Sequence, residues 1–217
     1  MIKDYYEAPN QDSLITSALN EATDGLDKYD ILSNIDELII KTHDLIQRKY
    51  FSHQNQSAKN AIKRYLNDSI QKEILSRDDL IDEIAKRFEE FSEFNMSLSQ
   101  ARRARAGKTF EKILLNYFNK LEIPFSYQPV VNGTPDFIIP SVTGYRTQPQ
   151  DTLVITAKRT VRERWRQITT EGARGYRFML ATLDHEISKQ TLNEMRENQL
   201  TLIIPQPIID KKKHYKN

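Results

Sequence analysis

The sequence contains no cysteine, and this absence excludes disulfide bonds, thiolate metal sites and cysteine nucleophiles. Long apolar runs are also absent, because no segment approaches the roughly 20 residues of a membrane-spanning helix. The N-terminal stretch MIKDYYEAPNQD has no apolar signal core. We therefore expect an intracellular protein that does not associate with a membrane.

Motifs of several common enzyme classes are missing as well. The sequence has no glycine-rich phosphate loop and no Gly-x-Ser-x-Gly motif, so it offers no basis for an NTPase, a serine hydrolase or a nucleotide cofactor. Its four histidines show no metal-ligand spacing, which argues against a histidine-based zinc site. The net charge is only +2, so nucleic-acid binding has to be inferred from local basic clusters.

The periodicity of apolar residues divides the 217 residues into two parts. Residues 1–96 show repeated helical spacing and predict a helical lobe, a DNA clamp or dimer contact, whereas residues 97–217 predict a mixed α/β core. The core begins with a helix that has an apolar face. It continues with the strands FSYQPVV, DFIIP and TLVITA, a helix over about 162–174, the strand YRFMLATL, a helix around 186–197 and the strand LTLIIP. The tail DKKKHYKN is expected to be frayed.

Charged side chains stand at the ends of two successive predicted strands. Asp136 begins the strand PDFIIP, and Lys158 ends the next strand, LVITAK. If these strands are adjacent, the carboxylate can bind a divalent cation and the ammonium can orient a water near a phosphate. Glu171, on the following helix, and Glu111, on the preceding helix, are candidates for further carboxylate ligands. Taken singly, these signals are weak, because an aspartate that follows a proline at the start of a strand is more often a turn residue and an exposed helical glutamate is usually a solvated charge.

The arrangement as a whole resembles the PD-(D/E)XK nuclease superfamily. Pro135 and Asp136 precede a strand, Lys158 ends the next strand, and a glutamate stands on the helix that follows. The acid that usually lies two residues before the lysine is replaced here by Thr156. One branch of type II restriction endonucleases, the CC/GG-reading EcoRII, SsoII and NgoMIV relatives, carries this carboxylate on the following helix, where Glu171 stands 13 residues after Lys158.

The resemblance covers about residues 98–175 and implies a restriction-endonuclease-like core, a mixed central sheet flanked by helices. It implies a Mg²⁺-dependent type II enzyme of the prokaryotic cytoplasm that cuts double-stranded DNA at a short palindromic or near-palindromic CC(N)GG-type site and leaves 5′-phosphate ends. A homodimer, or a higher assembly, would place one active site at each strand. Asp136, Glu171 and Glu111 would bind the metal ion, and Lys158 would position the attacking water.

Basic residues directly after the third strand predict base recognition. Arg162, Glu163 and Arg164 stand in succession, followed by Trp165 and Arg166. An arginine fork donates two hydrogen bonds to guanine, and a carboxylate accepts one from the amino group of cytosine. The triplet therefore has the chemistry to read adjacent G and C pairs, and the resemblance implies that it reads the CC/GG half-site. The alternative is a solvated helix with intrahelical ion pairs. Trp165 is expected to pack in the core, and Arg166 is a candidate backbone contact.

A second basic cluster lies in SQARRARAGKTFE. Its residues Arg102, Arg103, Arg105 and Lys108 are candidates for contacts with the DNA backbone, which supply affinity without sequence information. The resemblance implies that Gln100 meets the outer base pair from the minor-groove side and that Arg103 lies by the scissile strand. For Arg102 and Arg105, a plain surface helix start remains the alternative.

Two other functions stay open at this point. The same fold serves structure-selective nucleases of repair and recombination, which need basic surfaces but no base-reading triplet. Alternatively, Thr156 marks a nuclease fold that has lost catalysis and only binds DNA.

Overall fold

The computed structural model describes residues 1–70, 76–131, 133–161, 165 and 178–215. Within these residues, no helix is long and apolar enough to cross a membrane. The chain separates into two compact units, each built from two stretches of sequence. Unit 1 comprises Met1–Leu14 and Leu45–Arg105, and unit 2 comprises Ile15–Asp44 and Ala106–Asn217.

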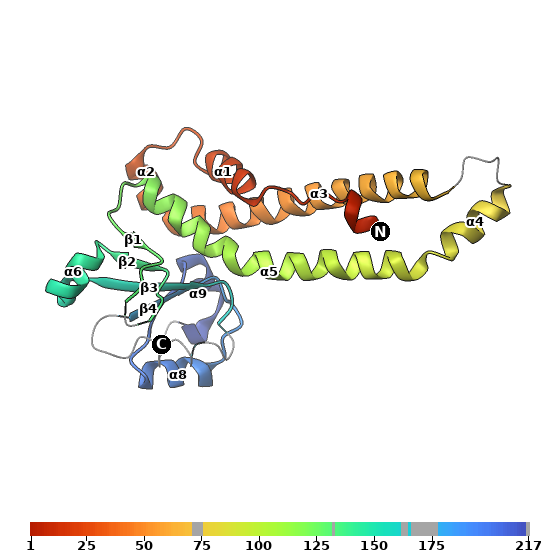
Figure 1. Cartoon of the computed structure of the whole chain (residues 1–217). Coiled ribbons are helices and arrows are strands. Elements are labelled where there is room, and N and C mark those ends of the chain that lie inside the picture. Colours follow the sequence, from red (N-terminus) through yellow and green to blue (C-terminus); the bar gives the residue numbers. More distant parts are fainter. Residues whose placement is uncertain (71–75, 132, 162–164, 166–177, 216–217) are drawn as a thin grey trace. The chain divides into compact units, whose positions relative to one another are not determined.

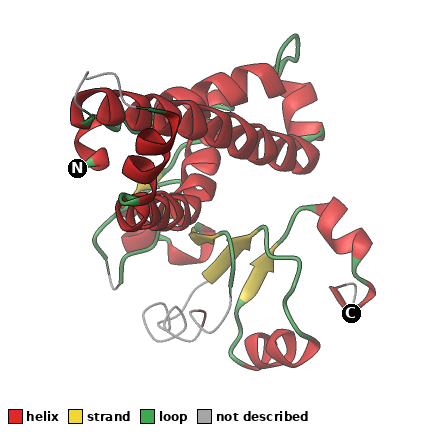
Figure 2. Cartoon of the chain, turned by 90° about the vertical axis from the view of Figure 1, so that its right-hand side faces the viewer, coloured by secondary structure: helices red, strands yellow, loops and turns green. Residues whose placement is uncertain are grey.

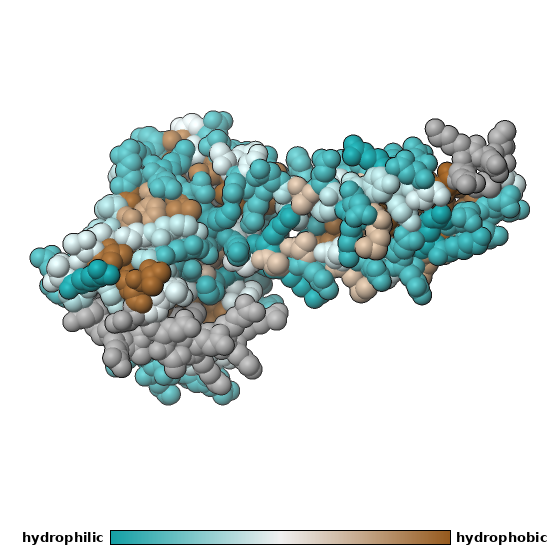
Figure 3. Space-filling model, in the orientation of Figure 1, coloured by the Kyte–Doolittle hydropathy of each residue, from teal (hydrophilic) through white to brown (hydrophobic). Residues whose placement is uncertain are grey.

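Unit 1 is helical (Figure 1). It contains η1 (Ile2–Tyr5), the start of α1 (Gln11–Ala22), most of α3 (Ile35–Ser69), α4 (Arg77–Ala85) and the first part of α5 (Phe88–Lys120). α3 and α5 lie side by side and enclose an apolar cluster of Ile2, Ala58, Ala61, Tyr65, Phe94 and Leu98. Gln54 is fully buried, and its amide donates to the carbonyl of Leu98 at 3.2 Å, which ties α3 to α5. In the view of Figure 3 these helices present a mainly hydrophilic surface.

Ser76 is the N-cap of α4. The Ser76 side chain accepts a hydrogen bond from the backbone N–H of Asp79, and Asp79 bonds back to the Ser76 backbone, which makes a capping box at the start of α4. The helix itself buries no residue. Leu80 and Ile84, which lie one helical turn apart, are exposed.

A five-stranded mixed sheet in the order β1-β2-β3-β4-β5 forms the centre of unit 2 (Figure 2). β1 (Ser126–Tyr127), β2 (Phe137–Ile139) and β3 (Leu153–Lys158) pair antiparallel. β3, β4 (Phe178–Thr182) and β5 (Thr201–Ile203) pair parallel. β3 is the middle strand and buries four consecutive residues, as its β-branched apolar sequence predicts. The predicted strand sequence is thus confirmed.

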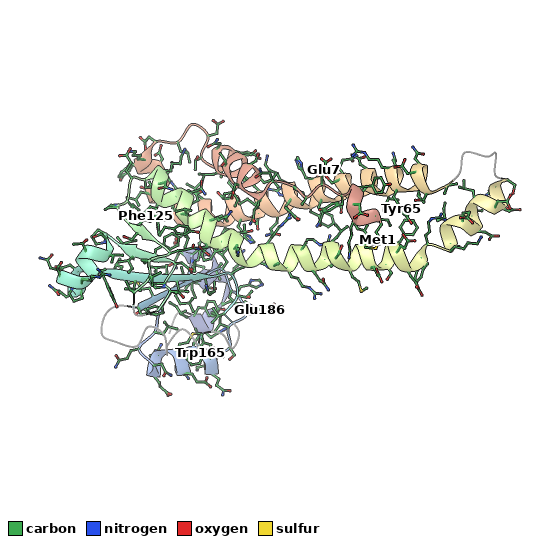
Figure 4. The ribbon with its side chains drawn as sticks, in the orientation of Figure 1. Met1, Glu7, Tyr65, Phe125, Trp165 and Glu186 are labelled. Atoms are coloured by element: carbon green, nitrogen blue, oxygen red, sulfur yellow. The ribbon has the colours of Figure 1, made fainter. Side chains whose placement is uncertain are left out.

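Unit 2 also contains helical segments. They are most of α1, α2 (Lys28–Ser33), the start of α3, the second part of α5, the short α6 (Val142–Thr147) and η2 (Pro149–Asp151), α8 (Lys189–Glu197), α9 (Gln206–Lys211) and η4 (Lys213–Tyr215). Between the sheet and α8 lies an apolar cluster that includes Leu180 of β4 and Met195 of α8. Trp165 belongs to this cluster with 4% of its surface exposed, so its expected core position is confirmed (Figure 4).

Two expectations differ from the structure in detail. The predicted boundary between residues 96 and 97 falls within α5, because the change of apolar pattern there does not interrupt the helix. The prediction of a frayed tail is wrong for residues up to 215, because the hydroxyl of Tyr215 and the ring of His214 both bond to the loop before α8. The run of lysines before His214 suggested a solvated tail, but Tyr215 is half-buried.

Candidate active site

Asp136 stands immediately before β2, where an aromatic cluster fixes the start of the strand. Phe137 is fully buried, and its ring lies 5.1 Å from that of Phe118 and 5.9 Å from that of Phe125. β2 pairs with β3 in a register that sets Phe137 opposite Ile155. Because the strands are antiparallel, the residue before Phe137 lies beside the last residues of β3.

The structure brings Asp136 and Lys158 together, as expected from adjacent strands. Asp136 Oδ2 accepts the backbone N–H of Ala157 at 2.7 Å and the Nζ of Lys158 at 3.3 Å. The Asp136 side chain is 11% exposed and that of Lys158 36% exposed, so the ammonium reaches solvent while the carboxylate is buried. No hydrogen bond engages Oδ1 among the described residues. One carboxylate oxygen is therefore fixed and the other is available to a ligand.

Glu111 reaches the same place from α5. It is buried, and its Oε1 accepts the hydroxyl of Tyr127 and the amide Nε2 of Gln128, both at 2.7 Å. Gln128 also donates its backbone N–H to the carbonyl of Asp136 at 2.8 Å. These contacts link the carboxylate on the helix to the strand that carries the other carboxylate.

Sequence reasoning missed Tyr127 and Gln128 as partners of Glu111. They lie 16 and 17 residues beyond it, and no local periodicity predicts such a contact. The one unusual feature is conformational: Gln128 has a φ of +45°, a left-handed backbone that residues other than glycine adopt rarely. Such strain often accompanies a functional position.

Electrostatics in the site favour a cation. Burial raises the pKa of the Asp136 carboxyl, and the charge of Glu111 acts in the same direction. The Ala157 N–H and the Lys158 ammonium oppose this increase. A nearby positive charge would stabilise the ionised form of this buried Asp136 carboxylate.

The donor set fits a hard divalent cation such as Mg²⁺, which prefers carboxylate oxygens. Asp136 Oδ1 and Glu111 Oε2 have no hydrogen-bond partner in the part of the chain that the structure describes. Glu171, the further carboxylate predicted from the sequence, lies outside the described residues. Among those residues, no group of three or more acidic or histidine side chains is placed to hold a metal ion.

Thr156 occupies the position where the superfamily usually has an acid. Its side chain lies on the same face of β3 as that of Lys158, because side chains alternate along a strand. Thr156 is 6% exposed and pairs in register with Leu180 of β4. A hydroxyl in this place brings no charge to the site, so the strand supplies the lysine but no second carboxylate.

The predicted base-reading residues Arg162, Glu163 and Arg164, together with Arg166, lie outside the described residues. The residues that flank the triplet are described. Val161 before it is 1% exposed and Trp165 after it is 4% exposed.

The residues of the second basic cluster all lie on α5 but in two units. Gln100 and Arg103 are exposed in unit 1, and Lys108 is exposed in unit 2. The carboxylate of Glu111 follows one helical turn after Lys108, so this lysine and the acidic site share the same part of α5.

Arg102 and Arg105 are held by other residues of unit 1. Arg102 donates to Oε1 of the buried Gln54 at 3.2 Å and to the hydroxyl of Ser99 at 2.9 Å. Arg105 donates to the hydroxyl of Tyr50, and its guanidinium lies 4.9 Å from the centre of that ring. These contacts orient both guanidinium groups within unit 1.

The sequence matches a known protein family over most of its length. The family model described as EcoRII C terminal matches residues 61–217, well over half of the chain. The chain belongs to this family. The type II restriction enzyme SsoII of Shigella sonnei is 35% identical over 134 residues, which cover 56% of this chain and 43% of that protein. EcoRII of Escherichia coli is 33% identical over 135 residues, which cover 58% of this chain and 33% of that protein.

Two solved structures of restriction endonucleases share the fold of this chain. Metal-depleted Ecl18kI in complex with uncleaved, modified DNA superposes with a TM-score of 0.80 at 25% identity, over 99% of this chain and 74% of that chain. The complex of restriction endonuclease PspGI with substrate DNA gives a TM-score of 0.61 at 24% identity, over 94% of this chain and 81% of that chain. The predicted restriction-endonuclease-like fold is therefore confirmed. The chain spans less than half the length of SsoII and EcoRII.

Proposed function

We propose that this protein is a type II restriction endonuclease that hydrolyses double-stranded DNA at a short CC(N)GG-type site in a Mg²⁺-dependent reaction. The observation that carries the proposal is the pairing of Asp136 with Lys158 across β2 and β3, with Glu111 bonded to the same segment, in a member of the EcoRII C-terminal family. Two carboxylates beside a lysine can bind a metal ion and orient water for attack on a phosphodiester.

The roles follow from the positions of the described residues. Asp136 and Glu111 would hold the metal ion through their unbonded oxygens, and Glu171 would be the further carboxylate. A bound Mg²⁺ supplies positive charge for the phosphate and acidifies water. Lys158, which is fixed at one side by Asp136 and open to solvent at the other, would orient the attacking water and face the phosphate. The expected products carry 5′-phosphates.

Residues of this chain would contact the DNA bases and backbone, and two copies of the chain would act together. Arg162, Glu163 and Arg164 would read the CC/GG half-site in the major groove, with Gln100 at the outer base pair. Arg102, Arg103, Arg105, Lys108 and Arg166 would contact the backbone. A palindromic site has two equivalent strands, so a homodimer would cut both. Double-stranded DNA is supported as the ligand because Ecl18kI and PspGI were both solved in complex with DNA.

Digestion of a plasmid, followed by sequencing of the fragment ends, tests this proposal. With Mg²⁺ we expect discrete fragments that share one short sequence and carry 5′-phosphates, and with EDTA we expect none. A smear, or cutting only at branched junctions, would instead identify a structure-selective nuclease. Replacement of Glu171 by Gln should abolish cleavage while DNA binding persists.

A DNA-binding protein without catalysis is the second candidate. It is supported by Thr156, which leaves β3 without the usual acid. The two candidates separate in the same experiment, because a binding-only protein retards the plasmid without producing new ends at any Mg²⁺ concentration. A Thr156→Asp variant that gains cleavage would support this second candidate, whereas a wild type that cuts excludes it.

A further inference from the structure

The two residues that flank the predicted base-reading tripeptide are buried in the interior of unit 2. Val161 directly precedes Arg162 in the sequence, and Trp165 directly follows Arg164. Val161 and Trp165 belong to one buried apolar cluster, in which Leu180 of the sheet is also a member. Whatever fixes Val161 therefore fixes the point at which the tripeptide begins.

A buried carboxylate holds the backbone of Val161. Asp184, in the loop after β4, is 9% exposed. Its Oδ2 accepts the backbone N–H of Val161 at 2.8 Å, and its Oδ1 accepts the backbone N–H of Glu186 at 2.9 Å. No ion pair to Asp184 is found among the described residues, so this charge is stabilised by backbone amides. Hydrogen bonds to an ionised acceptor are stronger than those between neutral groups.

Thr182 extends the same attachment back to the lysine of the candidate active site. It is fully buried at the end of β4 and pairs in register with Lys158. Its hydroxyl donates to the carbonyl of Arg159 at 3.3 Å and accepts the backbone N–H of Asp184 at 3.0 Å. Lys158, Arg159 and Val161 are thus each bonded to the end of β4 or to the loop after it.

The C-terminal segment closes this loop from its other side. The hydroxyl of Tyr215 donates to the carbonyl of Asp184 at 3.1 Å and accepts the backbone N–H of Ile187 at 2.8 Å. The Nε2 of His214 lies 2.9 Å from the carbonyl of Ile187. Tyr215 therefore acts on the same backbone that carries the Asp184 carboxylate.

We propose that Asp184 and Tyr215 are positioning residues for sequence recognition: they set where Arg162, Glu163 and Arg164 begin, without touching DNA themselves. This inference rests on the proposed function and deepens it. A bidentate contact between an arginine and a guanine requires both hydrogen bonds to be nearly linear. A displacement of Val161 would therefore weaken base reading, while contacts of other residues with the DNA backbone would persist.

A binding selection tests this inference without any need for cleavage. The full-length chain is incubated in EDTA with DNA duplexes that have a randomised centre, and the bound duplexes are sequenced. Asp184→Asn keeps the shape of the side chain but presents an NH₂ group to one of the two backbone donors. We expect the preference of this variant for the enriched motif over single-mismatch duplexes to fall about tenfold, the loss that weakening of one bidentate base contact produces. Affinity for a duplex without the motif should stay the same.

Tyr215→Phe provides a second variant that leaves the carboxylate intact and removes only the hydroxyl. It should lower the preference in the same direction but less. Ser188→Ala is the matched control, because Ser188 caps α8 in the same loop region and bonds to Thr191 rather than to Val161. This control should lower thermal stability and keep the full preference.

The outcomes separate the inference from the function on which it rests. A wild-type chain that enriches no motif overturns the proposed function, and the inference with it. A wild-type motif that Asp184→Asn and Tyr215→Phe retain in full overturns the inference alone. Equal losses in Asp184→Asn and Ser188→Ala at equal folded fractions would likewise overturn it, since the effect would then follow stability.

Discussion

Gln128 donates its backbone N–H to the carbonyl of Asp136 at 2.8 Å. The same residue donates its side-chain amide to the carboxylate of Glu111 at 2.7 Å, so one glutamine connects the two acidic residues of the candidate metal site. Its left-handed φ of +45° carries a conformational cost of order 1 kcal/mol. The two hydrogen bonds offset this cost.

Replacement of Gln128 by Ala should weaken metal binding. The variant loses the amide that fixes Glu111, so the carboxylate is free to rotate away, and we expect Mg²⁺ affinity to fall about tenfold, in line with other residues that orient metal ligands. Calorimetric titration with Mg²⁺ measures this. Gln206→Ala is the control, because it also removes a glutamine–carboxylate bond, here to Asp210 on an exposed helix, and should leave the affinity unchanged. Equal affinities in both variants would contradict the role given to Gln128.

Asp136→Asn should stabilise the metal-free protein at neutral pH. Burial raises the pKa of Asp136 above its ordinary 3.8, so the carboxyl contributes stability that is fully present below 3.8 and is lost as the pH rises through the folded pKa. The neutral amide avoids this loss, and the variant should gain about 1 kcal/mol in unfolding free energy at pH 7. The gain should disappear as the pH approaches 3.8.

Denaturant unfolding in EDTA at several pH values checks this, with the exposed Asp151→Asn as control. Addition of Mg²⁺ should then raise the stability of the wild type and not that of Asp136→Asn. A variant that is less stable than the wild type at pH 7, or that responds equally to Mg²⁺, would remove Asp136 from the metal site.

Lys158→Ala should abolish cleavage and preserve DNA binding. One ammonium among many basic groups contributes little to total affinity, but it is the group bonded to Asp136 at the end of β3. We expect the cleavage rate to fall at least about 100-fold, as is common for loss of a group that assists proton transfer or positioning. Single-turnover cleavage and gel retardation measure the two effects. Lys189→Ala, which removes an exposed lysine of the same unit, should change neither. A cleaving Lys158→Ala variant would locate the chemistry elsewhere.

Arg164→Ala should relax base discrimination at one position of the site. A lost bidentate contact is worth roughly 1–3 kcal/mol of discrimination against the wrong base. Binding to duplexes with single substitutions measures this loss, and Arg146→Ala, at an exposed position of α6, controls for the loss of charge. A uniform decrease of affinity on all duplexes would identify Arg164 as a phosphate contact instead.

His43 should make stability fall in mildly acidic solution. Burial lowers its pKa below the ordinary 6.5, the Arg159 charge lowers it further, and the bond to Asp44 opposes both. The stability linked to a group with a lowered pKa is present above 6.5 and is lost as the pH falls through the folded pKa. His43→Gln should therefore flatten the decrease of unfolding free energy below pH 6.5 by about 1 kcal/mol. The exposed His185→Gln variant should retain it, and an unchanged slope in His43→Gln would contradict this role.

The sequence predicted the parts of the site that depend on strand order. Asp136 and Lys158 stand at the ends of consecutive strands, and consecutive strands usually pair, so their meeting followed from local pattern. The link between Glu111 and Gln128 could not be predicted in this way, because it depends on how α5 lies against β1. No helix was predicted over Val142–Thr147, which is a single short helix of six residues capped by Ser141. The contacts of Tyr215 were not predicted, because the charged residues around it indicated a solvated tail and one aromatic residue does not change that pattern.

The division of the chain into units has a consequence for its synthesis on the ribosome. Residues 15–44 belong with residues 106–217, and Thr42 bonds to a buried partner, Tyr117, that emerges 75 residues later. The apolar side chains of residues 15–44 therefore stay exposed until residues 45–105 have been translated. A nascent chain of this kind is prone to aggregate or to pair wrongly before its partner exists, so slow elongation through residues 45–105 would lengthen its most vulnerable interval.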